Sequence, residues 1–382
     1  MLRKTLKSIV LCAATFASTN LLAQSNTPIK IGAFVARTGQ ASFLGEPAKK
    51  TLELFVADLN KAGGIKGRPV ELILYDSKSS AKDAAEIIRR LVDQDKVDLI
   101  VGGTSTGETM AVVPFVEESR IPFVSLAGAT IIVDPVKKYV FKTPHTDRMS
   151  VERIYKSVKA DKGTRVAILS GAGGYDQSCR KHAKDLAPAY AIQLVSDEQH
   201  GTGDTDVTVQ LTNIRSARAD AILYCGFGAP SAIVAKNHKQ LKLAARLYMT
   251  VGVASKAYIE GAEGAAEGSR VTSAPIIAYK DLPPSDPSYA VTWKFVESYL
   301  AAYKEEPSGF AGNAYDGILL ATEALKAAGT TDKEKVRAAL ENLKNVPGIN
   351  GVYNMSPTDH LGITADSLRI MEVKGKEFRL IP

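Results

Sequence analysis

The chain alternates short apolar runs with longer amphipathic segments, and this alternation constrains its fold more than any other feature of the sequence. Residues 29–36 (IKIGAFVA) have the composition of a buried strand, and residues 46–61 repeat apolar side chains at helical spacing. The same order continues with predicted strands at 70–75, 98–101 and 122–126 and a predicted helix at 81–95. Such a strand–helix–strand order predicts a parallel sheet with helices on both faces.

The alternation then starts again. It predicts strands at 165–169, 192–196, 221–224, 247–250 and 270–273, with helices at 176–187 and 207–215. Val70 and Asp98 are 28 residues apart in the first half, and Ala191 and Asp220 are 29 residues apart in the second. The unit that repeats is too long for a solenoid. The sequence therefore predicts an α/β fold with two similar, doubly wound parallel-sheet lobes.

In the last part of the chain, the pattern predicts helices at 289–303, 311–328 and 332–343 and strands at 368–373 and 378–381. The chain is predicted to form part of lobe one, then lobe two, then the rest of lobe one, and finally to cross to lobe two again. Several strands then connect the lobes and form a multi-strand hinge. We therefore predict an N-terminal lobe of residues 28–144 plus 276–350. The predicted C-terminal lobe is 145–275 plus 351–382.

Residues 1–23 have the organisation of a secretory signal peptide. A basic segment, residues 1–7, precedes an apolar run at 9–17 that is shorter than the about 20 residues needed to cross a bilayer. A small residue, Ala23, stands at the expected cleavage point. We therefore expect export to the periplasm with cleavage near Ala23. No later stretch has 18 uninterrupted apolar residues, so no further membrane segment is predicted.

The charge and the motifs exclude several classes of function. Removal of the predicted signal peptide lowers the formal net charge by three, from +7 to +4. A net charge of +4 attracts a polyanion only weakly. The five histidines are scattered without close pairs at metal-ligand spacing, and no phosphate-binding G-x-x-x-x-G-K-[ST] motif is present. We expect no nucleic-acid partner, no metal and no cofactor, and a monomeric protein.

Two cysteines, Cys179 and Cys225, follow the predicted signal peptide. An oxidising periplasm permits a disulfide, but sequence spacing does not show whether the two Cβ atoms meet. Two separate thiols are the preferred prediction, and a disulfide is the alternative.

Loops rich in small and hydroxyl residues follow two predicted strands of the first lobe. Thr104, Ser105 and Thr106 should open a helix, where free N–H groups and the positive dipole end suit a carboxylate. Residues 125–130 follow the neighbouring strand. Ligands of open α/β sheets bind beyond the carboxyl ends of strands. The two loops therefore predict one anion site, although each could also be an ordinary helix cap.

A catalytic alternative uses the same first loop. Residues 103–107 match the G-x-S-x-G pattern of a hydrolase nucleophile, with Ser105 at its centre and His360 near the C-terminus as the base. No oxyanion-hole segment of the His-Gly-Gly type precedes the strand, and two similar lobes are foreign to a single hydrolase sheet. We keep the secreted serine hydrolase as the alternative hypothesis.

Several short motifs follow one another in a fixed order along the chain. They are Ile31-Gly-Ala-Phe, Thr38-Gly39, Gly45, Asp58-Leu-Asn60-Lys-Ala-Gly63-Gly64-Ile-Lys-Gly67-Arg, Asp76, Asp98-Leu-Ile-Val-Gly-Gly, Gly128-Ala-Thr, Asn313-Ala-Tyr315-Asp316 and Asp359-His360-Leu-Gly362. With these motifs the chain resembles the type I periplasmic solute-binding proteins of ABC transporters, in the branch of the leucine/isoleucine/valine-binding protein. The resemblance covers nearly all of the chain after residue 23.

The resemblance implies a non-enzymatic protein that closes two lobes on a small carboxylate and delivers it to a membrane permease. A ligand-sensing component that docks on a receptor would use the same fold. The implied ligand contacts come from three loops of lobe one and two aromatic positions of lobe two, with a weaker match on a late helix. They are Phe43 and Leu44; Thr104, Ser105 and Thr106; Gly128, Ala129 and Thr130; Tyr175 and Phe227; and Tyr315, whose alternative role is helix packing.

One departure from that family concerns the ligand. The amino-acid binders place an acid of lobe two on the ligand ammonium, whereas residues 248–253 (YMTVGV) contain no acid here. A buried ammonium without a partner is strongly disfavoured. Asp176 is another acid near this region, but we do not assume that it replaces the missing acid. The sequence thus favours an aromatic or aliphatic carboxylate without an amino group, and a branched-chain amino acid stays open.

Overall fold

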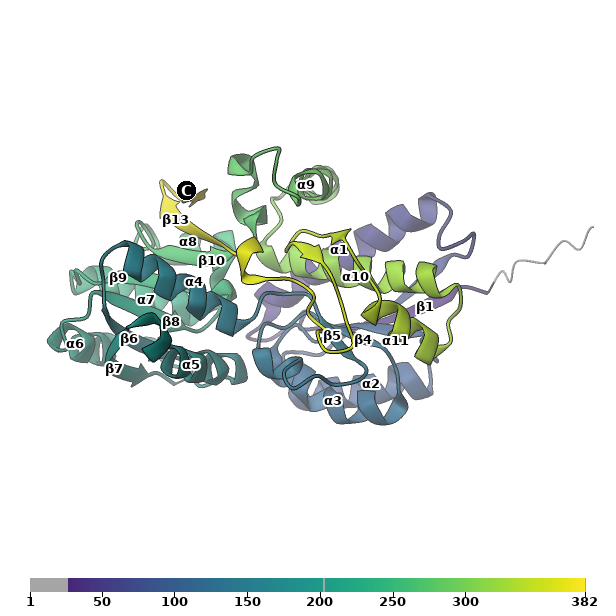
Figure 1. The fold of residues 1–382 in the computed structure, drawn as a ribbon, viewed down its shortest axis with the longest axis horizontal. Helices are drawn as coiled ribbons and strands as arrows, with labels where there is room; N and C mark the ends of the chain where they lie inside the picture. Colours follow the sequence, from purple (N-terminus) through teal and green to yellow (C-terminus); the bar gives the residue numbers. More distant parts are fainter. Residues whose placement is uncertain (1–26, 202, 382) are drawn as a thin grey trace, which may run out of the picture.

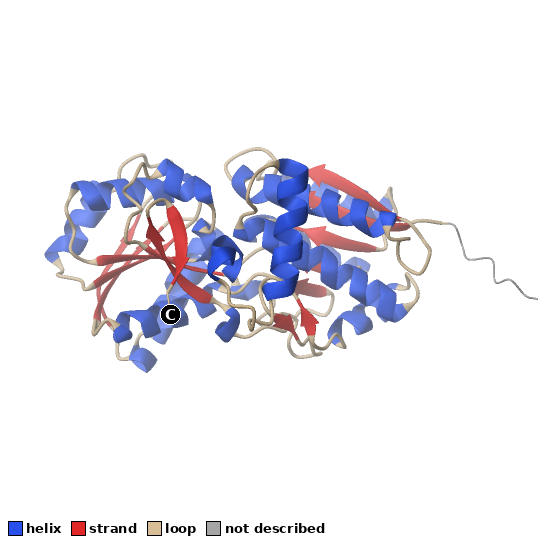
Figure 2. Ribbon diagram, turned by 90° about the horizontal axis from the view of Figure 1, so that it is seen from above, coloured by secondary structure: helices blue, strands red, loops and turns tan. Residues whose placement is uncertain are grey.

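Two α/β lobes lie next to each other along the long axis of the molecule (Figure 1). The computed structural model describes residues 27–201 and 203–381, so the predicted signal peptide lies outside the described residues. Within those ranges no helix combines the length and the apolar character needed to span a bilayer. Figure 2 shows each sheet, in red, between helices.

The first lobe contains a five-stranded parallel sheet in the order β2-β1-β3-β4-β5. Its strands are β1 (Ile29–Val35), β2 (Val70–Asp76), β3 (Leu99–Gly102), β4 (Phe123–Ser125) and β5 (Val140–Lys142). Every strand of this sheet is dominated by apolar residues, as expected for a sheet that is buried on both faces. The alternation in the sequence therefore predicts this half of the fold correctly.

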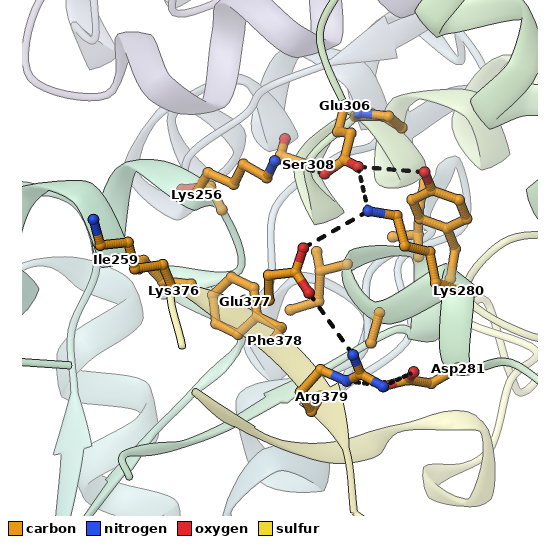
Figure 3. A pocket seen from close by; sticks show the side chains of 16 residues that line it. Lys256, Ile259, Lys280, Asp281, Glu306, Ser308, Lys376, Glu377, Phe378 and Arg379 are labelled. Atoms are coloured by element: carbon orange, nitrogen blue, oxygen red, sulfur yellow. Dashed lines mark hydrogen bonds and ion pairs between the residues drawn. The ribbon is translucent and has the colours of Figure 1, made fainter. Parts of the chain in front are cut away.

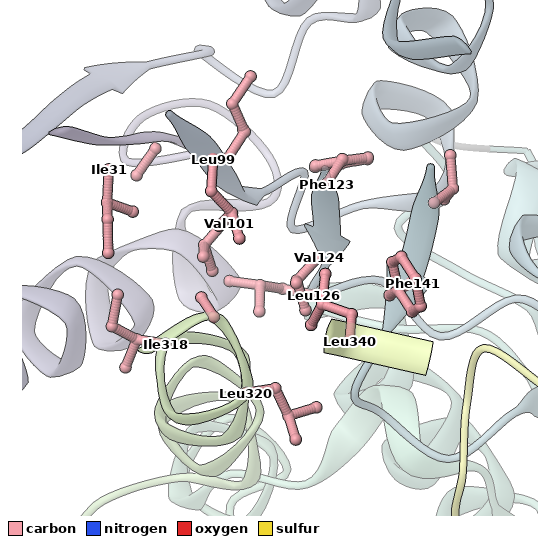
Figure 4. Packing of buried hydrophobic residues seen from close by; sticks show 14 of the residues in the cluster. Ile31, Leu99, Val101, Phe123, Val124, Leu126, Phe141, Ile318, Leu320 and Leu340 are labelled. Atoms are coloured by element: carbon pink, nitrogen blue, oxygen red, sulfur yellow. The ribbon is translucent and has the colours of Figure 1, made fainter. Parts of the chain in front are cut away.

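Helices cover both faces of the first sheet, with α2 and α3 packed together and α1 packed against α10 (Figure 1). The helices of this lobe are α1 (Ser42–Lys61), α2 (Ala81–Asp93), α3 (Thr106–Ser119), α9 (Tyr289–Tyr303), α10 (Gly309–Ala328) and α11 (Lys333–Glu341). Helix α10 supplies Ile318 and Leu320 to the apolar cluster that contains Val101 and Val124 of the sheet (Figure 4).

The second lobe contains a seven-stranded mixed sheet in the order β14-β13-β10-β9-β8-β6-β7. Five strands are parallel: β6 (Arg165–Ser170), β7 (Gln193–Gln199), β8 (Ala221–Cys225), β9 (Arg246–Met249) and β10 (Arg270–Ser273). The last two strands of the chain, β13 (Arg369–Lys374) and β14 (Glu377–Leu380), extend it as antiparallel strands.

Alternate residues of these strands enter two separate cores, because successive side chains of a strand point to opposite faces. Val166 and Ile168 of β6 pack with α4 (Asp147–Ala160) and α5 (Gly174–Leu186). Ala167 and Leu169 pack with the helices on the other face, α6 (Thr208–Ser216), α7 (Ala229–Gln240) and α8 (Lys256–Gly261).

Three segments of the chain connect the lobes: residues 143–146, 274–288 and 364–368. The first and third touch each other, since His145 Nε2 lies 2.8 Å from Ser367 Oγ. Several connections agree with the predicted multi-strand hinge, but they consist of loops and short 3₁₀ helices and not of β-strands.

The third connection begins later than we expected. Residues 351–363, which we assigned to the C-terminal lobe, pack in the first lobe, where Tyr353 and Met355 join its apolar cluster. The cause is Asp316 of α10, which accepts the N–H groups of Ile349 (2.7 Å) and Asn350 (2.8 Å) and the hydroxyl of Tyr353 (2.8 Å). These bonds hold the small ladder of β11 (Val346–Pro347) and β12 (Val352–Tyr353) on lobe one.

Candidate ligand site

A cavity of about 60 Å³ lies between the lobes, beyond the carboxyl ends of strands from both sheets. This is the position at which open α/β sheets bind ligands. It is lined by Leu44, Thr104, Ser105, Thr106, Leu126, Gly128, Phe310 and Asn313 of lobe one, by Tyr175, Phe227, Val251 and Gly252 of lobe two, and by Pro144 between them. Most of its wall is apolar, with hydroxyl groups at one end.

The hydroxyl groups at that end have different tasks. Ser105 is the N-cap of α3: its Oγ accepts the N–H of Glu108 (3.3 Å), and the Glu108 carboxylate accepts the N–H of Ser105 (2.9 Å). Thr104 Oγ1 accepts the N–H of Ala36 (3.1 Å). These two hydroxyls therefore serve the fold as reciprocal caps and links between loops.

Thr106 is the member of this loop that is free for a ligand. It is the first residue of α3, and its buried Oγ1 has no hydrogen-bond partner among the residues that the structure describes. The N–H groups of the first helical turn have no acceptor within the helix, and the helix dipole makes this end positive. The arrangement suits an anionic group at Thr106.

The second predicted loop contributes less than we expected. Gly128 lines the cavity, but Ala129 and Thr130 do not. Thr130 begins a short 3₁₀ helix, Thr130–Ile132, which turns its N–H (2.8 Å) and its hydroxyl toward Asp147 Oδ1. The predicted direct contact of Thr130 with the ligand is therefore replaced by a structural bond to Asp147.

The two lobes touch around the cavity. A Cβ atom on Gly128 would lie 3.0 Å from Cε2 of Tyr175, so the absence of a side chain allows this approach. A Cβ atom on Gly174 of lobe two would lie 3.5 Å from Cγ2 of Thr106. The structure is thus a closed arrangement, in which residues of both lobes surround the same space.

Aromatic side chains close one side of the cavity. The Phe43 ring centroid lies 6.1 Å from that of Phe227 in the other lobe and 5.5 Å from that of Phe310. Phe43 stands behind the lining, whereas Leu44 is part of it. Both belong to the first turn of α1, not to a loop as we predicted. Gly45 allows this helix start, since a Cβ atom there would lie 2.0 Å from the Ala36 carbonyl oxygen.

Tyr315 does not reach the cavity. Its ring packs against Phe55 (centroids 5.3 Å apart) and Phe295 (4.8 Å), and it lines a separate groove of about 240 Å³ between α1, α9 and α10. The packing role that we weighed for Tyr315 is therefore the one that the structure shows.

The residues of the hydrolase alternative are not partners. The His360 ring stacks on Phe141, its Nδ1 lies 2.9 Å from the Val140 carbonyl oxygen, and its Nε2 lies 3.4 Å from a Glu341 oxygen. Val140 starts β5 and aligns across β4 with Ile100, whereas Ser105 lies beyond the other end of β3. Ser105 therefore has no catalytic base in His360.

Cys179 and Cys225 form a disulfide, with Cα atoms 5.7 Å apart. The preferred prediction of two separate thiols is therefore wrong, and the alternative is correct. Cys179 projects from the buried face of α5, and Cys225 ends β8 on the same face of the sheet. The bond joins α5, whose second residue is Tyr175, to the strand that precedes Phe227.

Sequence reasoning named only about half of the lining. Pro144, Phe310 and Asn313 were not predicted, while Leu126, Val251 and Gly252 lie in loops that we placed at the site without naming these residues as contacts. Val251 and Gly252 directly follow a predicted strand, so the strand-end rule could have found them. The return of α10 to lobe one was predicted, but the approach of Phe310 and Asn313 to the cavity depends on tertiary packing, which no local pattern reveals.

Two buried ionisable groups stand just outside the lining. Asp176 follows Tyr175 and accepts the N–H of Gly173 (2.9 Å), and burial raises its pKa to about 6. Lys142 ends β5, and burial lowers its pKa to about 7 against the opposing effect of Asp147. Among residues 27–201 and 203–381, no group of three or more His, Cys, Asp or Glu side chains is placed to hold a metal ion.

A surface pocket, also of about 60 Å³, lies beside the second connecting segment and is lined in part by residues 276–281 (Figure 3). Its walls carry a chain of ion pairs. Glu306, which precedes α10, pairs with Lys256 of α8 (2.7 Å) and with Lys280 (3.0 Å). Glu377 continues the chain to Lys280 and Arg379, both at 3.8 Å. The network joins elements of both lobes outside the ligand cavity.

Comparisons with known proteins agree with this geometry. The Leu/Ile/Val-binding protein BraC3 of Rhizobium johnstonii is 25% identical over 371 residues, which are 96% of this chain and 97% of that protein. The leucine-, isoleucine-, valine-, threonine- and alanine-binding protein of Pseudomonas aeruginosa is 24% identical over 330 residues, which are 86% of this chain and 85% of that protein.

A solved structure and a family model extend the agreement. The crystal structure of an extracellular ligand-binding receptor from Rhodopseudomonas palustris HaA2 has a TM-score of 0.86 at 26% identity, and the match covers 93% of this chain and all of that one. A family model described as "Periplasmic binding protein" matches residues 28–377. The chain therefore belongs to the periplasmic binding protein family.

Proposed function

We propose that this protein is the periplasmic substrate-binding component of an ABC transporter, which captures a small carboxylate between its lobes and delivers it to a membrane permease. The family membership and the names of the relatives support this role. The observation that carries the ligand class is the unpartnered, buried Thr106 hydroxyl at the start of α3, inside a cavity closed by both lobes.

The chemistry of the cavity limits the ligand. The positive end of α3 and the Thr106 hydroxyl suit a carboxylate, while Leu44, Phe227 and Val251 suit an apolar body. The closed cavity is small, so the ligand is small as well. A branched-chain amino acid or a related aliphatic or aromatic acid has this combination of one charged end and one apolar end.

Binding would proceed by closure of the lobes. A ligand that contacts α3 on one lobe and the Tyr175 and Phe227 side chains on the other stabilises the closed state, because these contacts exist together only there. The three connecting segments provide the hinge. No covalent step is needed, and we propose saturable binding without turnover by a monomer.

A thermal-shift screen of amino acids and of aliphatic and aromatic acids tests the proposal. Ligands that bind only the folded state raise its melting temperature. In calorimetric titrations with the best ligand, Thr106→Val should weaken binding about 10- to 100-fold, the value of a hydrogen bond to a charged group.

A matched control is available on α9. Thr292→Val removes another buried hydroxyl without a partner, and it should leave the affinity unchanged. If no carboxylate shifts the melting temperature, or if Thr106→Val binds as tightly as the wild type, the assignment of the anion site is wrong.

A further inference from the structure

A buried polar cluster lies behind the lobe-two wall of the ligand cavity, near the carboxyl ends of β6, β7 and β8. It consists of Asp176 of α5, His200 after β7 and Tyr224 of β8, and each residue is at most 6% exposed. A Cβ atom on Gly171 would lie 2.3 Å from Asp176 Oδ2 and 3.4 Å from His200 Cε1. The carboxylate and the imidazole ring therefore approach the same point just outside the cavity lining.

His200 has a complete set of partners without Asp176. Its Nδ1 lies 2.9 Å from the carbonyl oxygen of Gly201, which can only accept, so Nδ1 carries a proton. Its Nε2 lies 3.1 Å from Tyr224 Oη, which donates to it when the ring is neutral. Neither ring nitrogen is left to bond the carboxylate.

Asp176 itself is only half satisfied. Its Oδ2 accepts the N–H of Gly173 (2.9 Å), whereas its buried Oδ1 has no hydrogen-bond partner among the residues that the structure describes. Burial raises the pKa of this carboxyl to about 6, although the Gly173 N–H and the nearby His200 oppose the rise. Protonation removes the charge that burial disfavours. A moderate change of pH therefore changes the charge of the lobe-two wall.

The segment that Asp176 holds forms part of the closed boundary between the lobes. A Cβ atom on Gly173 would lie 3.5 Å from Cε1 of Phe227, which lines the cavity. A Cβ atom on the next residue, Gly174, would lie 3.5 Å from Cγ2 of Thr106 in the other lobe. The Asp176 carboxylate and Thr106 therefore lie on opposite sides of the same two-glycine segment.

The titratable groups around this end of α5 come from each element packed against it. They are Tyr175 of α5 itself, His200 after β7, Tyr224 of β8, Asp147 of α4 and Glu108 of α3. Burial raises the pKa of both tyrosines, so both stay protonated near neutral pH. Within the described part of the chain, no lysine or arginine forms an ion pair with Asp176.

We infer that binding of a carboxylate in the cavity takes up a proton at Asp176, so that the protein holds its ligand more tightly as the solution becomes more acidic. A ligand carboxylate at Thr106 brings a second negative charge close to Asp176. Two like charges in a site that is shielded from water favour protonation of one of them. This inference rests on the proposed function and adds its regulation by pH.

The sign follows from the linkage between the two equilibria. Without ligand, Asp176 is mostly protonated below pH about 6 and mostly charged above it. The ligand charge raises the pKa of Asp176 further. Between these two pKa values the bound protein keeps a proton that the free protein has lost, so Kd increases as the pH rises. A difference of one pKa unit between the two states amounts to about tenfold in Kd.

Calorimetric titrations of the mature wild-type protein between about pH 5.5 and 7.5 test the inference. The probes are L-leucine, 4-methylpentanoate and 3-phenylpropanoate, whose carboxylates stay largely ionised in this range. We expect the probe that binds best to bind about tenfold more tightly at the acidic end. Titrations in buffers with different ionisation enthalpies should show net proton uptake on binding near the middle of the range. A Kd that does not vary with pH, or binding without proton uptake, overturns the inference and leaves the proposed function intact.

Variants of α5 assign the proton. Asp176→Asn keeps an oxygen for the Gly173 N–H but cannot titrate, so its Kd should not vary with pH and should match that of the wild type at the acidic end. Asp185→Asn is the matched control, because it removes an exposed acid from the other end of the same helix, and it should keep the wild-type pH profile. A purely structural role of Asp176 would instead weaken binding equally at every pH, which contradicts the inference.

A second buried group near the cavity titrates in the same range, since burial lowers the pKa of Lys142 to about 7. If Asp176→Asn keeps the wild-type pH profile, the proton belongs to another group such as Lys142, and the inference is wrong. If Asp176→Asn does not fold, Asp176→Ser, whose hydroxyl can accept the Gly173 N–H, takes its place. If none of the three probes binds the wild type at any pH, the proposed function itself fails and the inference fails with it.

Discussion

Removal of the disulfide should cost about 4 kcal/mol of the free energy of unfolding. Cys179 and Cys225 are 46 residues apart. In the chain-entropy model, closure of a loop of this length removes about 13 to 14 cal/mol/K from the entropy of the unfolded chain, or about 4 kcal/mol at 25 °C. Both cysteines are fully buried, so their replacement by alanine adds the loss of sulfur packing to this value.

The measurement is urea unfolding of the mature protein, with and without a thiol reductant. The wild type should lose stability when the reductant is added, whereas a Cys179→Ala/Cys225→Ala variant should be weaker from the start and insensitive to reductant. Titration of free thiols after denaturation should find none in the oxidised wild type. Two free thiols in that protein, or a wild-type curve that ignores the reductant, would refute the reasoning.

The same variant reports on the ligand site. Because the bond ties α5, whose first turn contains Tyr175, to the strand before Phe227, its loss should loosen two contacts of lobe two at once. We expect weaker ligand binding in the double variant at a temperature at which it is still folded.

Three further predictions concern charge, space and the lobe junction. Because burial raises the pKa of Asp176 to about 6, the folded state holds this proton more tightly, and the wild type should lose about 2 to 2.5 kcal/mol relative to Asp176→Asn as the pH rises from 4 to 7 in urea unfolding. Gly128→Ala should weaken ligand binding about tenfold in calorimetry, since its Cβ would press on Tyr175, whereas Gly107→Ala, with no atom within 4 Å of the new Cβ, should bind normally. Glu306→Gln should destabilise the protein by about 1 kcal/mol at low salt, and the difference should shrink in 1 M NaCl when melting curves are compared.

The sequence predicts the layered fold well because the strongest patterns lie in long buried elements. The predicted helix at 289–303 matches α9 and the predicted strand at 270–273 matches β10 at both ends. Two elements around residue 145 were missed. Strand β5 has only three residues and ends in a buried lysine, so it shows no apolar period. Helix α4 does carry Val151, Ile154, Tyr155 and Val158 at helical spacing, so the sequence holds the signal that would have predicted this helix.

The site was predictable only where a local rule applies. A run of hydroxyl residues after a strand correctly indicates the start of α3, because the capping box is a local pattern. The bond from Thr130 to Asp147 depends on the orientation of a turn, and the disulfide depends on the rotation of α5 about its axis. Only tertiary packing fixes these two orientations. The contact of Asp147 with Thr130 depends on the meeting of α4 with the loop after β4, and no spacing in the sequence encodes that meeting.

The interleaved path of the chain determines the order in which the lobes can be completed. The first sheet ends at residue 142, yet its covering helices α10 and α11 follow the whole of residues 165–273, and the second sheet waits for β13 and β14 at the very end. A chain that emerges from its N-terminus therefore cannot finish lobe one before residues 309–363 follow the second lobe's parallel strands, and it cannot finish lobe two before its last segment is present. A truncation of even the final fifteen residues would remove two strands from lobe two, so neither lobe can be produced alone by cutting the chain once.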